Sequence, residues 1–90
     1  MMENIVVVGR IVHYVLESGR SEGAHRPAIV VRDLKQPHGL VQLQVFTDGL
    51  NDRYLIDDHV AGESPNVIWR TDVRYSEKPE PGTWHFMMEG

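Results

Sequence analysis

The stretch LVQLQVFT (residues 40–47) alternates apolar and polar side chains with a period of two. Successive side chains of a β-strand point to opposite faces, so the alternation gathers three aliphatic side chains on one face: Val41, Leu43 and Val45. The opposite face carries two glutamines, which mark it as wet, and Phe46 stands out on it. The stretch therefore predicts a strand of an antiparallel sheet with one face in the core.

Similar stretches lie on both sides of this strand, with turn sequences between them. Four of them are rich in β-branched and aromatic residues and predict strands: 5–17, 27–34, 66–75 and 83–87. Gly9 marks a bend in the first, and Pro27, which has no N–H group, fits the start of the second. Helical spacing of apolar residues is not sustained anywhere, and residues 53–64 are predicted to form a loop. We expect an all-β fold, a small antiparallel SH3-like barrel of about five strands.

The size and charge of the chain narrow the classes of function. The 90 residues predict a single domain, residues 1–90, without cysteine. Such a chain buries only about 60–65% of its unfolded surface, so we expect a homo-oligomer to supply further burial. A net charge of −4 argues against binding to long nucleic acids, which requires a basic face. The longest apolar stretch, residues 5–8, is too short to cross a membrane, and no signal-peptide pattern is present.

The first candidate site is formed by His25 and Arg26, which directly precede Pro27. Arginine offers a planar fork of donors and histidine a titratable one, so the pair suits a phosphate or carboxylate group. Pro27 fixes its own φ and restricts Arg26 to extended conformations, which would present the pair from a rigid base. The alternative is a solvated loop end in which Arg26 pairs with a nearby acid such as Glu22.

Aromatic residues supply candidates for stacking against a base. Trp84 and His85 follow the rigid connector before the last strand, and Phe46 is the exposed aromatic residue of the central strand. The alternative for Trp84 is structural, as a plug that closes one end of the barrel. Because strand side chains alternate, Trp84 and Phe86 are expected on one side of the strand and His85 on the other.

Arg70 and Arg74 supply a candidate second phosphate contact. Simple alternation along residues 66–75 places both on one face together with Asp72. This face is either an anion-binding ladder or a solvated surface on which Asp72 bridges the two arginines.

No metal, cofactor or catalytic motif is predicted. The TDGLND turn (residues 47–52) offers oxygen ligands but lacks EF-hand spacing. Three further histidines lie on separate segments without HxH or HxxxH spacing: His13, His38 and His59. A histidine metal site would therefore depend wholly on tertiary convergence. A phosphate-binding glycine loop and a Ser-His-Asp signature are also absent, so the sequence predicts a protein that is not an enzyme.

Four stretches in order resemble a family of short uncharacterised proteins from tailed bacteriophages and prophages: GRIVHYVL (9–16), HRPAIVVRD (25–33), LQVFTDGLND (43–52) and PGTWHF (81–86). The resemblance implies a viral origin. Because membrane-spanning and signal-peptide patterns are absent, we expect the protein in the host cytoplasm. HRPAIVV also resembles a strand of the MazF/PemK toxin ribonucleases, which are SH3-like barrels. That resemblance implies a catalytic role for Arg26, with Thr47 as the hydroxyl. The chain is acidic, however, and lacks the C-terminal helix of that family.

Three functions follow from these patterns. The first is a phage-encoded, non-catalytic sponge that sequesters a small anionic, nucleotide-type immune signal of the host. Its site would comprise seven residues: His25, Arg26, Phe46, Arg70, Arg74, Trp84 and His85. The second is a structural or decoration protein of the virion, and the third is a MazF-like endoribonuclease. We expect the sponge, acting as a homo-oligomer with no membrane or long nucleic acid as partner.

Overall fold

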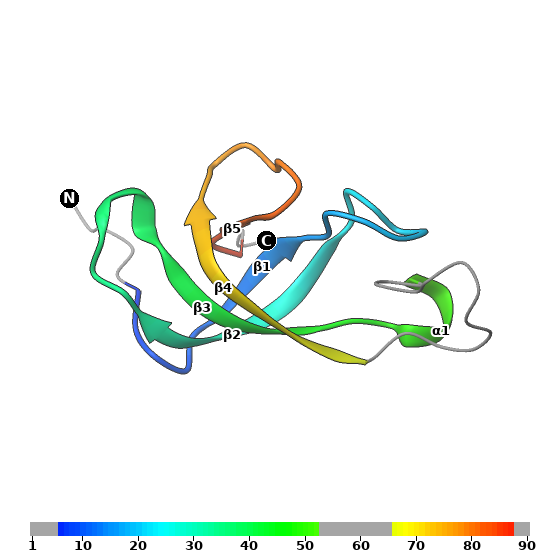
Figure 1. The fold of residues 1–90 in the computed structure, drawn as a ribbon, viewed down its shortest axis with the longest axis horizontal. Coiled ribbons are helices and arrows are strands. Elements are labelled where there is room, and N and C mark those ends of the chain that lie inside the picture. The colour runs from blue at the N-terminus through cyan, green and yellow to red at the C-terminus, as the bar shows by residue number, and fades with distance from the viewer. Residues whose placement is uncertain (1–5, 53–65, 88–90) are drawn as a thin grey trace.

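A computed structural model describes residues 6–52 and 66–87 and shows five strands that close into a small barrel (Figure 1). The strands are β1 (Ile11–Val15), β2 (His25–Asp33), β3 (Val41–Phe46), β4 (Val67–Tyr75) and β5 (Thr83–His85). A single 3-10 turn, η1 (Pro37–Gly39), precedes β3, and the four-residue helix α1 (Gly49–Asp52) follows it. The predicted all-β class and small barrel are thus confirmed. No helix in the described segments has the length and apolar character needed to span a membrane.

Neighbouring strands pair in sequence order, and β5 closes the barrel by pairing with β1. All these pairs are antiparallel except β4 with β5, which run parallel. The first strand is shorter than predicted, because β1 begins at Ile11, after a turn in which Gly9 adopts φ +94°. The loop predicted at residues 53–64 lies outside the described residues.

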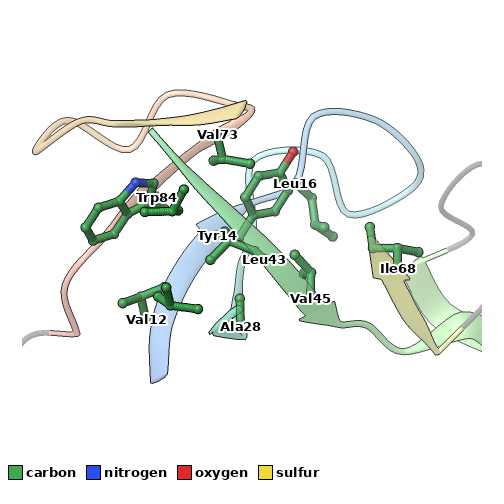
Figure 2. Packing of buried hydrophobic residues seen from close by; sticks show 11 residues of the cluster. Val12, Tyr14, Leu16, Ala28, Leu43, Val45, Ile68, Val73 and Trp84 are labelled. Carbon is green, nitrogen blue, oxygen red and sulfur yellow. The ribbon is translucent and has the colours of Figure 1, made fainter. Parts of the chain in front are cut away.

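The barrel interior is filled by one cluster of apolar side chains (Figure 2). β3 contributes its three aliphatic residues, Val41, Leu43 and Val45, all fully buried as the alternation predicts. β1 and β2 add side chains from the same inner side: Val12, Tyr14, Ala28 and Val30. The inner faces are therefore occupied by packed side chains, and binding chemistry in these strands is confined to their outer faces and ends.

A bulge in β4 changes which of its side chains face the core. The register pairs Leu43 with Arg70 and Val41 with Val73, so β4 has one more residue than β3 over this interval. Asp72 takes up the extra residue with φ +54°, a conformation that aspartate tolerates better than most residues. Arg70 and Val73 therefore share a face and Arg74 lies on the other. The prediction that Arg70 and Arg74 share a face is wrong.

Trp84 is part of the core and is only 1% exposed. Its indole Nε1 donates a hydrogen bond of 2.8 Å to the carbonyl oxygen of Gly39, and its ring lies against those of Tyr75 and Phe86. Of the two interpretations of Trp84, the structure supports the plug, because a fully covered ring offers no face on which a base could stack.

Gly39→Ala is expected to lower the free energy of unfolding by about 2 kcal/mol, measured by urea denaturation. Gly39 has φ +63°, and an added Cβ would lie 2.9 Å from the Cβ of Tyr75, so left-handed strain adds to overpacking. Gly23→Ala is the matched control, because Gly23 also has a positive φ but open space around its Cβ position. Equal losses in the two variants would show that the contact with Tyr75 contributes nothing.

Candidate metal centre

Three histidines from three strands converge on the outer surface of the barrel. His13 of β1 lies directly opposite His85 of β5 in the register. His25 of β2 pairs with Val15, two positions along β1, and is therefore diagonal to His13. All three occupy outward positions, since their strand neighbours Tyr14 and Trp84 point into the core.

The three imidazole rings are close enough to share one ion. Their centroids are 5.7 Å apart for His13 and His25, 5.4 Å for His13 and His85, and 4.7 Å for His25 and His85. One ring nitrogen from each histidine lies within 4.8 Å of those of the other two. In a tetrahedral zinc site with Zn–N bonds of about 2.0–2.1 Å, ligand nitrogens are about 3.3 Å apart. Binding of one ion would therefore require the ring nitrogens to move closer to one another.

The surroundings of His13 and His85 favour the neutral imidazole, the form that binds metals. Burial lowers the pKa of His85, and the neighbouring His25 and His13 lower it further. Burial also lowers the pKa of His13, with a smaller contribution from His25. Within residues 6–52 and 66–87, His85 Nδ1 is buried and has no hydrogen-bond partner, an arrangement that costs about 1–3 kcal/mol unless another group satisfies it. A metal ion bound to this nitrogen would satisfy it.

The histidines are the whole donor set of this group. Among the residues that the structure describes, no carboxylate joins the three-histidine group, and the chain has no cysteine. The donors are thus three neutral nitrogens, a set typical of zinc, copper and nickel and unlike the oxygen-rich sites of calcium or magnesium.

Arg26 does not form a clamp with His25. The two side chains leave opposite faces of β2, and Arg26 binds Asp52 through two hydrogen bonds, Nε to Oδ2 at 2.9 Å and Nη2 to Oδ1 at 2.5 Å. Asp52 is fully buried and also accepts the backbone N–H of Asp48. The partner of Arg26 is therefore Asp52 and not Glu22, and its guanidinium joins β2 to α1.

Arg70 and Arg74, which were predicted to form a second phosphate contact, each pair with a different acid. Arg70 forms an ion pair of 3.2 Å with Glu17, and Arg74 one of 3.2 Å with Glu80. Asp72 therefore does not need to bridge them. Phe46 lies on the outer face of β3, as predicted, and is 36% exposed.

The acidic turn after β3 is held together by its own hydrogen bonds. Asp48 accepts bonds from the backbone and side-chain amides of Asn51, and Asp52 is engaged by Arg26. These contacts account for the residues TDGLND without a cation.

Of the seven predicted site residues, only His25 and His85 belong to the three-histidine group, and His13 is the residue that the prediction missed. A usable signal was present, because three of the four stretches quoted for the phage resemblance each contain one of these histidines. His38 lies in η1, outside the cluster, and His59 falls outside the described residues.

Comparisons with family models, curated proteins and solved structures found no match.

Proposed function

We propose that this protein is a non-catalytic binding protein that holds a divalent transition-metal ion on His13, His25 and His85. The observation that carries the proposal is the convergence of three ring nitrogens from three separate strands. Zinc is the favoured ion, because imidazole suits it and its filled d shell tolerates whatever geometry the three strands impose. Copper and nickel are the closest competitors for the same donors.

Two of the contacts predicted for a nucleotide sponge are not available to a ligand. Arg26 is bound to Asp52, and the ring of Trp84 is covered. Neutral histidines are also weaker partners for phosphate than charged ones, and the lowered pKa values of His13 and His85 favour the neutral form. Direct anion binding by protein side chains is therefore less well supported than metal binding.

The phage origin, the host cytoplasm and the homo-oligomer remain proposals. Support for self-association comes from large apolar side chains on the outer surface: Ile11, Val31, Phe46, Val67 and Trp69. Trp69 lies opposite Gln44, and Val67 opposite Phe46, so two of these side chains are direct neighbours across strands.

Zinc is expected to bind with one ion per chain and to stabilise the fold. At a free zinc concentration 100-fold above Kd, binding adds about 2.7 kcal/mol to the free energy of unfolding. In a domain of this size the gain raises Tm by roughly 10–20 °C. Calorimetric titration of the metal-free protein gives the stoichiometry and Kd, and a thermal melt gives the shift. Sedimentation with and without zinc reports the oligomeric state in the same samples.

The variant His25→Gln tests the site, because His25 is the exposed member and its replacement leaves the core intact. Its zinc affinity is expected to fall by more than about 100-fold, since even changes outside the ligand set cost 10–100-fold. His38→Gln, also exposed but outside the cluster, serves as the matched control and should bind zinc like the parent. Parent protein that takes up no zinc, copper or nickel, or equal binding by the His25 and His38 variants, would refute the proposal.

A further inference from the structure

The donor set leaves one tetrahedral position without a ligand from the described part of the chain. Three histidines supply three nitrogens, and the group contains no fourth side chain. In proteins, zinc sites with three protein ligands keep the fourth position for water or for an incoming molecule. A closed structural site would need another histidine, cysteine or carboxylate in the group.

The fold determines the direction in which this position faces. The sheet formed by β5, β1 and β2 lies beneath the three rings, and its inner side is packed with Val12, Tyr14 and Trp84. The outer side is covered near Val15 and Thr83, which are both buried, and it is open at His25, which is exposed. An incoming ligand would therefore reach the fourth position from the side of His25.

The positive charge of the ion favours an anionic ligand at the fourth position. Three neutral imidazoles leave the full double positive charge on the ion, and a bound ion is often the largest local charge in its site. The nearest arginine in sequence, Arg26, is already neutralised by Asp52. A metal ion would thus supply the cationic centre that Arg26 does not.

We infer that the metal ion on His13, His25 and His85 takes the phosphate or carboxylate group of a small anionic ligand at its fourth position. The inference rests on the proposed function. Apolar side chains beside His13 on the outer face would suit a ligand with a flat apolar part. Pro27 lies opposite His13, and the pairing of Ala28 with Val45 places Phe46 beside Pro27. Both side chains are exposed and lie one and two strands from His13.

Cobalt provides the test, because Co²⁺ occupies zinc sites and its visible absorption responds to a change of ligand. The cobalt-loaded full chain is titrated with adenosine monophosphate as a phosphate probe and with acetate as a carboxylate probe. We expect a saturable spectral change with at least one probe. Adenosine monophosphate should bind the loaded protein at least about tenfold more tightly than the metal-free protein, a difference that calorimetry resolves.

The outcomes separate this inference from the function on which it rests. If cobalt binds and neither probe alters its spectrum, the inference fails and metal binding stands. If adenosine monophosphate binds equally well with and without cobalt, the anion contacts the protein and not the ion, and the inference also fails. If cobalt does not bind, the calorimetric comparison is made with the zinc-loaded protein, and both proposals fall if zinc, copper and nickel also fail to bind. Phe46→Ala should weaken the binding of adenosine monophosphate and leave the binding of acetate unchanged. An equal loss of affinity for both probes would contradict the proposed stacking surface.

Discussion

Trp84→Ala is expected to lower the free energy of unfolding by about 3–5 kcal/mol, the largest loss expected of any single substitution in this chain. Trp84 is 1% exposed, and its removal leaves a cavity beside Tyr75 and Phe86 and an unpaired carbonyl at Gly39. Domains of this size are stable by only about 5–15 kcal/mol, so the variant should be close to unfolding at 37 °C. Urea denaturation followed by circular dichroism measures the loss.

The second tryptophan of the chain provides the control. Trp69 is 45% exposed on the outer face of β4, and Trp69→Ala should cost no more than about 1 kcal/mol. Trp84→Phe keeps an aromatic ring but loses the donor to Gly39, and should lie between the two alanine variants. A Trp84→Ala protein as stable as Trp69→Ala would contradict the placement of Trp84 in the core.

Arg26→Ala is expected to cost about 3 kcal/mol, because it leaves the buried carboxylate of Asp52 without its charged partner. Removing one member of a buried ion pair costs about 3–5 kcal/mol, and the lower end applies because Arg26 itself is 26% exposed. Arg74→Ala is the matched control, since the pair of Arg74 with Glu80 is about half exposed on both sides and contributes under about 1 kcal/mol. Equal losses in the two variants would refute a structural role for Arg26.

The acid sensitivity of the fold gives an independent measure of the same pair. Hydrogen bonds from Arg26 hold the pKa of Asp52 well below its usual range, against the opposing effect of burial. A carboxyl whose pKa is depressed in the folded state stabilises the fold above its unfolded pKa of about 3.9 and loses this contribution as the pH falls below it. The parent should therefore lose stability between about pH 5 and pH 2. Asp52→Asn should be less stable at pH 7 and show a smaller loss in acid.

This structural role of Arg26 changes how its variants are interpreted. A variant that binds no ligand because it has partly unfolded would imitate the loss of a binding residue. Binding experiments on this protein are therefore better performed with variants of His25. This residue is exposed and forms no ion pair with the residues that the structure describes.

Alternation along the chain predicted the five strands and most of their faces, but not where the first two begin: β1 starts at Ile11 and β2 at His25, two residues before Pro27. Val41, Leu43 and Val45 are buried and Phe46 is exposed, because alternate side chains of a strand point to opposite faces and only one face of β3 covers the core. The same reasoning placed Trp84 and His85 on opposite sides of β5, as the structure shows. It failed in β4, because a single extra residue at the bulge reverses the alternation beyond Asp72.

Which side chains meet at the candidate site depends on pairing between strands that are distant in the sequence. His13 and His85 are 72 positions apart (85 − 13) and meet only because β5 closes the barrel against β1. The partner of Arg26 is likewise 26 positions away, on a helix that the sequence pattern did not predict. By itself the sequence determined which side of each regular strand faces the core, since that depends on local periodicity. Only the tertiary structure decided which outward side chains meet, because contacts across strands depend on the register and closure of the whole barrel.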